Sequence, residues 1–539
     1  KSFEKEFSTI RIIDLKGAIR GKSGEAAKRE GQNVFDIMTG VAITIVTKNP
    51  SFIGSALIEY CSVPEYAKRD QKLSFLINSR SVLSGQISAS RIHPNEHGDW
   101  IGQRSDLFNS LIPLCDKEKN SKNLRFFSFI SNGAKTQRDS WNYNYSKSIL
   151  LENVGKSIDF FNSQSSLLQI GSIEEVSFDE TKFSWTANTL KDVSNFKSYS
   201  INNKVVRKVA YRPFNAIYWY GAKELNERVS QNFKLLPRSD SENYVILCSG
   251  LNTRLDNTSV FISNLISDLN LLDSGTQCFP LYYYEQRSKQ NPNLFEQEGA
   301  EEYTRRDGVS DFILKRAKEQ YGAKNISKED IFYYVYGFLH SPDYRTAFAN
   351  DLKKMLPRLP LVEAIKDFWA FSKAGRALAE LHINYETVPP APGVLTLVGT
   401  ITKKQMEKAA SGGSMKDVDY RVQKMRFGKK QEKQEDGKTK NVDDLSTIIY
   451  NAQITIDNIP EKAYEYVVNG KSAIEWIMER YQLKTDKKSG IKNDPNDWAD
   501  EVGNPRYILD LLLSVINVSI QTVDIVAGLL KVEFETEKA

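Results

Sequence analysis

The pattern of hydrophobic positions changes along the chain, and it begins with β-branched runs inside the first eighty residues. These runs are STIRIIDL at 8–15, VAITIVTK at 41–48 and GSALIEYC at 54–61. Continuous apolar strands of this kind are typical of a sheet that is buried on both faces, as in α/β proteins. A helical pattern follows at 64–76. We therefore predict an α/β unit over residues 1–80.

Aromatic residues become frequent beyond residue 80, while the helical period weakens. The clearest examples are LRFFSFI at 124–130, YRPFNAIYWY at 211–220 and CFPLYYY at 278–284. Short strands joined by turns are expected from such stretches. The sequence therefore predicts a β-rich unit over residues 81–300.

The helical period returns between residues 301 and 385. It is present at 309–322, 327–341, 342–356 and 361–382. Ser327 and Asp330 have the spacing of a capping box at a helix start, and Pro360 precedes the last of these stretches. These signals predict a helical subdomain over residues 301–390.

The C-terminal part of the chain mixes both patterns. PPAPG at 389–393 indicates a linker, and a strand-rich segment over 391–460 contains a charged run at 429–441 that we interpret as a mobile, exposed hairpin tip or loop. The final unit, over 461–539, has helical patterns at 461–470, 472–482 and 505–530, with Ser472 as the cap of the second helix. The predicted fold class is multi-domain, α/β and α+β.

Charge and composition exclude only a few functional classes for this protein. The net charge of +5 and the pI of about 8.6 allow an anionic partner without requiring one. The four cysteines lie far apart, which argues against a metal or redox framework and suits a reducing cytoplasm. No apolar run approaches eighteen residues, so we predict no membrane span. The start KSFEKEFSTI has neither Met nor a signal peptide, and we expect a cut inside a larger polypeptide.

Motifs for metals and nucleotides are considered and rejected. HPNEH places His93 and His97 four residues apart, but Pro94 and Gly98 disfavour the helix that a zinc site of this kind needs, so we predict an ordinary loop. GKS triplets at 21–23 and 470–472 lack the earlier glycine of a phosphate-binding loop. No spacing singles out catalytic residues, and the chain by itself supports no reaction.

Polar and aromatic side chains gather in certain loops in a way that suits nucleic acid. Arg, Lys, Asn and Gln match the base edges, Lys, Arg, Ser and Thr hold phosphates, and aromatic rings stack on unpaired bases. The candidate DNA-binding residues are Asn95, Gln103, Arg104, Lys135, Thr136, Gln137, Arg138, Asp139, Arg212, Asn215, Lys223 and Arg228. The competing interpretation is that these stretches are strands and turns whose Trp and Tyr residues pack in a core.

The order of the motifs gives this chain a resemblance to a known family. HPNEHGDWIGQR, NGAKTQRDSWNYNYS, YRPFNAIYWY, DIFYYVYGFLHSPDYR, KMRFGKK and SGIKNDPNDWAD follow one another as in the C-terminal portion of type ISP restriction–modification enzymes. Those single-chain proteins combine a nuclease, a helicase-like ATPase, an adenine-N6 DNA methyltransferase and a target recognition domain.

The resemblance implies a division of labour within the chain. Residues 1–80 would be the last part of a Rossmann-like methyltransferase sheet, and the remainder would be a mixed β-rich and helical target recognition domain that binds double-stranded DNA. The FxGxG-type and NPPY-type motifs of the family do not occur here, so no catalytic or cofactor-binding residue is assigned. S-adenosylmethionine, ATP and Mg²⁺ would be used by the methyltransferase and helicase-like domains upstream.

Within the loop at 131–147 the resemblance favours particular residues. Lys135, Gln137 and Arg138 are expected to face DNA, whereas the alternating residues Trp141, Tyr143 and Tyr145 are expected to pack in the core. The family often has a basic residue in the strand after YRPF, and NAIYWY has none, which favours a scaffold role for that strand.

Alternative functions remain open on the sequence. One is that the chain is itself a working methyltransferase, which the missing motifs argue against. Another is an interdomain scaffold, in which the helical segments 301–385 and 461–530 clamp the motor to the methyltransferase without reading bases.

Overall fold

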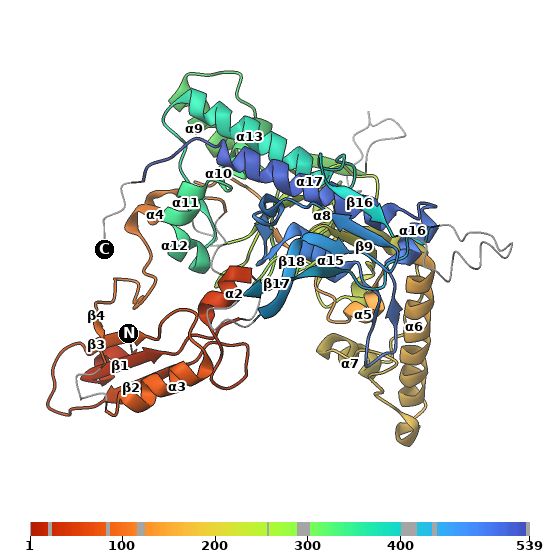
Figure 1. Cartoon of the computed structure of the whole chain (residues 1–539). Helices are drawn as coiled ribbons and strands as arrows, with labels where there is room; N and C mark the ends of the chain where they lie inside the picture. Colours follow the sequence, from red (N-terminus) through yellow and green to blue (C-terminus); the bar gives the residue numbers. More distant parts are fainter. Residues whose placement is uncertain are drawn as a thin grey trace.

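Small sheets and long helices alternate along the chain in the computed structural model. The structure describes residues 2–19, 24–81, 87–115, 124–255, 258–287, 302–399, 418–433 and 439–534. Figure 1 shows a central body with a helical layer above it, while the N-terminal unit and an arm formed by α6 (Lys147–Gln169) and α7 (Ala187–Ser194) extend from its lower side. The prediction of short strands is wrong for this arm, which is helical. The Gly21-Lys22-Ser23 triplet lies outside the described residues.

The N-terminal unit contains a mixed sheet in the order β2-β1-β3-β4. The elements are α1 (Ser2–Glu6), β1 (Thr9–Asp14), α2 (Gly24–Glu30), β2 (Ala42–Thr47), β3 (Leu57–Ser62), α3 (Arg69–Asn78) and β4 (Ser90–Ile92). β1 runs parallel to β3, with Thr9 opposite Leu57, and antiparallel to β2. The predicted strands and helix are confirmed. The expected burial on both faces is wrong for β2, because it is an edge strand and almost all of its residues are exposed.

The central body is built on antiparallel strands. One sheet has the order β11 (Val260–Ser263), β10 (Val245–Cys248), β12 (Gln277–Pro280) and β6 (Ser131–Asn132), and another the order β7 (Tyr143–Asn144), β9 (Asn215–Tyr220) and β8 (Val206–Arg212). Every residue of β10, β11 and β12 is buried. Two further antiparallel pairs do not belong to these sheets. β13 (Tyr282–Gln286) pairs with β14 (Tyr303–Asp307). β5 (Ile112–Pro113), which follows α4 (Asp106–Ser110), pairs with β15 (Arg358–Leu359). The aromatic stretches at 211–220 and 278–284 therefore form strands as predicted, whereas 124–130 has, within the described part of the chain, only a single bridge, from Phe127 to Val309.

The helical layer contains α9 (Asp311–Tyr321), α10 (Lys328–Phe338), α11 (Pro342–Ala347), α12 (Ala349–Lys354), α13 (Ile365–Ile383) and α17 (Tyr507–Ala527). The predicted cap is confirmed, since Ser327 Oγ accepts a hydrogen bond from the Asp330 N–H at 3.1 Å. The single helix predicted at 342–356 is divided at Phe348, whose ring is buried. Gly337 and Gly375 let α10 and α13 touch at their backbones: a Cβ on Gly375 would lie 1.9 Å from the Tyr333 carbonyl oxygen.

The C-terminal elements join the core of the body. A sheet in the order β16 (Leu395–Val398), β19 (Ile454–Asp457), β18 (Thr439–Ile449) and β17 (Arg426–Lys433) contains the predicted hairpin, of which residues 434–438 are outside the described part. The helix expected at 461–470 is wrong: a 3₁₀ turn at Glu461–Tyr464 leads into β20 (Val467–Val468), which pairs with β21 (Lys471–Ser472). Ser472 caps α15 (Ala473–Arg480), as predicted. A hairpin of β22 (Lys484–Thr485) and β23 (Lys492–Asn493) and then α16 (Asn496–Glu501) precede α17.

Helix α17 is long and apolar enough to cross a membrane by length and composition, with a mean hydropathy of 1.6 over an 18-residue window. This corrects the expectation that no apolar run approaches that length. Leu509, Leu512, Val515 and Ile516 of this helix belong to the same buried cluster as Trp219 of β9. Burial of 61% of the window inside the protein is what a core helix of a globular protein shows.

Candidate nucleic-acid interface

The loop that contains Lys135 and Gln137 is paired with a second segment from a distant part of the chain. The Lys135 N–H donates to the Arg228 carbonyl at 2.7 Å, and the Arg228 N–H donates to the Lys135 carbonyl at 2.9 Å. The two residues are directly opposite in an antiparallel bridge, so their side chains lie on the same side. Gln137 and Arg228 are exposed, and Lys135 is half-buried. We call these three residues the loop tip.

Gln137 adopts a left-handed backbone conformation with φ of 58°. Side chains with a Cβ rarely take this conformation, and it persists only where the surroundings impose it. The surroundings here are the bridge to Arg228 and a hydrogen bond from Ser184 Oγ to the Gln137 carbonyl at 3.3 Å. The amide of Gln137 is therefore presented outward on a constrained backbone.

The residues beside the loop tip point inward. Thr136 is 1% exposed and its hydroxyl donates to Asp139, which also accepts a hydrogen bond from Tyr211 Oη at 3.0 Å. Asn215, which is 2% exposed, donates from Nδ2 to Tyr145 Oη at 2.8 Å. The expected packing of Trp141, Tyr143 and Tyr145 is confirmed, because all are buried. Thr136, Asp139 and Asn215 thus hold the loop rather than present polar groups to solvent.

A buried ion pair lies beneath the loop. Arg212 Nη1 donates to Asp268 Oδ1 at 2.7 Å, and Tyr143 Oη donates to Asp268 Oδ2 at 2.8 Å. Asp268 is 1% exposed, and burial raises the pKa of its carboxyl above the usual value even with Arg212 beside it. The guanidinium of Arg212 also lies over the ring of Tyr211 at 3.9 Å from its centroid. Arg212 was expected to contact DNA, but the structure gives it an internal partner.

Arg138 is the residue whose position differs most from expectation. It was expected to face DNA, yet it is 3% exposed. Its Nε and Nη2 donate to the Ser184 carbonyl at 3.2 and 3.0 Å, and Nη2 also donates to Thr186 Oγ1 at 3.2 Å. Burial lowers the pKa of this guanidinium to about 10. It therefore stays charged near neutral pH while it binds a segment 46 residues further along the chain.

The candidate residues before α4 form hydrogen bonds within their own loop. Asn95 Oδ1 accepts from the His97 and Asp99 N–H groups, and Gln103 Nε2 donates to the His93 carbonyl at 2.6 Å. Arg104 Nε donates to Asp99 Oδ2 at 2.8 Å.

The Asp99 carboxylate also receives Lys354 of α12, whose Nζ lies 3.0 Å from Asp99 Oδ1. Burial would raise the pKa of Asp99, but the hydrogen bonds from Arg104 and Lys354 hold it below the usual range. Asn95 and Arg104 therefore serve this loop, whereas Lys223, in a 3₁₀ turn at Lys223–Leu225, is exposed.

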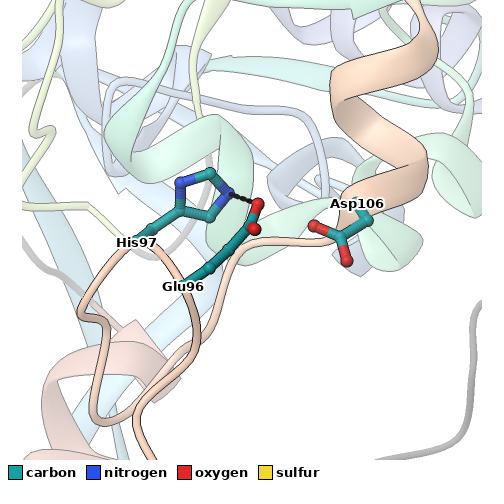
Figure 2. Close-up of side chains that lie close together, drawn as sticks. All are labelled: Glu96, His97 and Asp106. Atoms are coloured by element: carbon teal, nitrogen blue, oxygen red, sulfur yellow. Dashed lines mark ion pairs between the residues drawn. The ribbon is translucent and has the colours of Figure 1, made fainter.

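The same loop brings Glu96, His97 and Asp106 close together, as Figure 2 shows. One ligand atom from each lies within 4.8 Å of the others, and Asp106 comes from the start of α4 rather than from the HPNEH stretch. Glu96 and Asp106 are exposed, and His97 Nε2 already lies 3.3 Å from Asn109 Nδ2. The arrangement is thus explained by the geometry of the loop and the helix start.

Sequence reasoning missed Ser184, Thr186 and Asp268, which hold the loop in place. Thr186 carries a local signal, because a Thr followed by a short amphipathic pattern indicates a helix cap. Ser184 binds Arg138 through its backbone carbonyl and Gln137, 47 residues away, through its hydroxyl, and Asp268 binds Arg212, 56 residues away, so neither carries such a signal.

A family model and two solved structures indicate the same family. The family model described as the type ISP C-terminal specificity domain matches residues 125–511. The structure of LlaBIII, an ATP-dependent type ISP restriction–modification enzyme bound to DNA, is similar with a TM-score of 0.81 and 36% identity over 99% of this chain. A nuclease-deletion mutant of the type ISP enzyme LlaGI with a DNA substrate mimic has a TM-score of 0.80 and 34% identity over 100% of this chain.

A DrdV–DNA complex is similar with a TM-score of 0.75 and 28% identity over 98% of this chain. No curated protein matches the chain. The chain spans only 31%, 45% and 48% of the lengths of the LlaBIII, LlaGI and DrdV chains.

Proposed function

This chain belongs to the family of type ISP C-terminal specificity domains, and on that premise we propose that it is the DNA target recognition module of a type ISP restriction–modification enzyme. The observation that carries the proposal is the loop tip, where the exposed Gln137 lies on a constrained backbone two residues beyond the bridge of Lys135 to Arg228. The DNA present in the LlaBIII, LlaGI and DrdV structures supports duplex DNA as the ligand.

The chemistry of the loop tip suits the reading of base edges. A Gln amide donates and accepts at once and pairs with the N6 and N7 atoms of adenine, while Lys and Arg reach guanine edges or phosphates. Among the described residues, neither Lys135 nor Arg228 forms an ion pair, so both charges are available to an anionic ligand. Gln137 is the proposed base reader, and the two cations position the duplex.

Replacement of Gln137 by glycine tests the base-reading role. Glycine accepts the left-handed backbone without strain, so Gln137→Gly removes the amide and leaves the loop in place. We expect discrimination between a duplex selected from a random pool by the wild-type chain and its single-base variants to fall by roughly 1–3 kcal/mol at one position. Competition binding titrations measure this difference.

Asn252→Gly is the matched control for this variant. Asn252 is also an exposed amide residue with φ of 58°, and it lies in a different loop. It should leave the base preferences unchanged. If Gln137→Gly keeps the base preferences of the wild-type chain, the loop tip is not the reader.

In the whole enzyme, we propose that this module presents a target adenine for N6 methylation and directs translocation and cleavage. Those steps would take place in upstream domains that use S-adenosylmethionine, ATP and Mg²⁺. The cytoplasm, where cellular DNA of a bacterium lies, is the compartment that we propose for it.

The N-terminal unit is proposed to pack against the upstream part of a methyltransferase domain. Its edge strand β2 and the preceding loop expose large apolar side chains, and their exposed fractions are 66% for Phe35, 54% for Met38, 37% for Ile43 and 37% for Val46. Several large apolar side chains exposed along one sheet edge indicate an interaction site. A methyltransferase sheet that continues past β2 would cover it.

Charged substitutions at this edge test the packing proposal. Met38→Glu with Ile43→Glu should lower the binding of a hydrophobic dye and the self-association of the chain, because both side chains are exposed and apolar. Ile170→Glu, at a single apolar residue of the arm that is even more exposed, at 73%, is the control and should change dye binding less. Equal dye binding and self-association in the double variant and the wild-type chain would contradict the proposal.

A further inference from the structure

Arg138 joins the loop tip to helix α7 (Ala187–Ser194). The carbonyl of Ser184 and the hydroxyl of Thr186 accept its hydrogen bonds, and Thr186 is the N-cap of α7. The guanidinium also lies over the ring of Phe183, 5.4 Å from its centroid. A buried arginine with these partners sets the position of the start of α7 relative to Gln137.

Two further hydrogen bonds strengthen the same junction. Ser184 Oγ donates to the Gln137 carbonyl at 3.3 Å, and Asn188 Nδ2 donates to Glu227 Oε2 at 3.1 Å. Glu227 directly precedes Arg228 of the loop tip. The first turn of α7 therefore lies beside the loop tip, and Figure 1 shows α7 below the body, beside α6.

One face of α7 is polar and exposed. Asn188, Lys191 and Asn195 are exposed and follow the spacing of one helical face, while Thr189 and Val193 are buried on the opposite side. Among the described residues, Lys191 forms no ion pair. Asn195 is the last member of the face, at the C-cap of the helix.

The charge around this junction favours an anion. The cations at this junction are Lys135, Lys191, Lys223 and Arg228, and the carboxylates are Glu224 and Glu227, of which Glu227 already accepts a hydrogen bond from Asn188. Asp192 of α7 is occupied by Lys197, whose Nζ lies 2.7 Å from Asp192 Oδ1, and by Tyr199 Oη at 2.9 Å. The charged side chains of this junction therefore carry an excess of positive charge, which extends from the loop tip onto α7.

We propose that α7 is a second DNA-contacting element, whose face of Asn188, Lys191 and Asn195 lies against the phosphate backbone of the duplex that the loop tip reads. The inference rests on the proposed function, since it takes duplex DNA as the ligand. Arg138 is then a positioning residue that makes the loop tip and the helix one continuous surface.

Salt-dependent binding tests the contact at Lys191. Each phosphate contact adds about one unit to the slope of log affinity against log salt concentration, independent of sequence. Lys191→Ala should therefore lower this slope by about one unit and weaken binding to a selected and to a random-sequence duplex by the same factor. Lys191→Glu should weaken both further.

Lys156→Ala is the matched control on the same arm. Lys156 lies on α6 (Lys147–Gln169), pairs with Glu152 on an exposed face of that helix, and is away from its buried residues. This variant removes the same charge and should leave the slope unchanged. If Lys191→Ala has the slope of the wild-type chain, the inference is wrong, and the surface of α7 serves another partner.

Cross-linking gives an independent measurement of the same contact. All four native cysteines are buried, so Asn195→Cys supplies a selectively reactive thiol for a photoactivatable cross-linker. We expect cross-links to duplex DNA from Asn195→Cys and none from Lys156→Cys. Equal cross-linking from the two positions would overturn the inference.

The outcomes separate the inference from the proposed function. If Gln137→Gly loses base discrimination while the Lys191 variants bind like the wild-type chain, the recognition function stands and the role of α7 fails. If the wild-type chain shows no preference for any duplex and no salt-dependent binding, both fail.

Discussion

Replacing Arg212 by leucine is expected to destabilise the protein by about 3–5 kcal/mol near neutral pH, because it leaves the carboxylate of Asp268 buried without its cation. Asp268 is 1% exposed, and its other side-chain partner is Tyr143 Oη. Chemical denaturation monitored by Trp fluorescence measures the loss in the free energy of unfolding.

The loss in the Arg212→Leu variant should depend on pH with a definite sign. Burial already raises the pKa of Asp268 in the folded protein, and removal of Arg212 raises it further. Between the unfolded pKa of about 4 and this raised folded pKa, the folded state holds a proton that the unfolded state has released. Stability is therefore retained at low pH and lost as pH rises, so the deficit should shrink as pH falls from about 7 to about 5.

The double variant Arg212→Leu with Asp268→Asn isolates the uncompensated charge. The amide keeps an acceptor for Tyr143 Oη but carries no charge, so the double variant should be more stable than Arg212→Leu alone. A deficit in Arg212→Leu that is independent of pH and is not relieved by Asp268→Asn would show that Asp268 is not the cause.

Replacing Trp219 by alanine is expected to lower the free energy of unfolding by about 3–5 kcal/mol, because the substitution leaves a large cavity in the hydrophobic core beside strand β9. Trp219 is fully buried, and its Nε1 donates to Asn226 Oδ1 at 2.9 Å. Asn226 in turn donates to the carbonyls of Tyr220 and Ala222 and so orders the turn that leads to Arg228. Thermal or chemical unfolding measures the effect.

Trp219→Phe separates the cavity from the hydrogen bond. Phenylalanine fills most of the volume but has no donor for Asn226, so we expect a smaller loss of about 1–2 kcal/mol. Equal losses in the alanine and phenylalanine variants would assign the effect to the hydrogen bond instead of the cavity. A large loss in the alanine variant would also support a scaffold role for strand β9, whose sequence NAIYWY has no basic residue.

The candidate site could be located from sequence but not resolved into individual roles. The polar composition of residues 135–139 and their place in the order of family motifs indicate this loop. Two neighbouring residues nevertheless differ in burial, since Gln137 is exposed and Arg138 is buried. From the sequence alone, an arginine could equally contact DNA or form hydrogen bonds inside the protein. Only the hydrogen bonds from Arg138 to Ser184 and Thr186 show that it has the internal role.

The motifs that reveal the family are mostly internal to the fold. YRPFNAIYWY forms a buried hairpin, and Asn95 and Arg104 of HPNEHGDWIGQR hold a loop around Asp99. Such residues identify the family because they maintain its fold, which is why a resemblance carried by them does not by itself identify the surface that contacts a ligand.

The sequence by itself determined the strands of the N-terminal unit and the helix starts at Ser327 and Ser472, because these depend on local periodicity and capping. It also determined the family, through the resemblance that the order of its motifs carries. Only the tertiary structure decided that β2 is an exposed edge, that residues 461–470 form a turn and a strand, and which polar side chains face outward. The physical reason is that burial depends on contacts between segments far apart in the chain. The pairing of Lys135 with Arg228 and of Arg212 with Asp268 is of that kind.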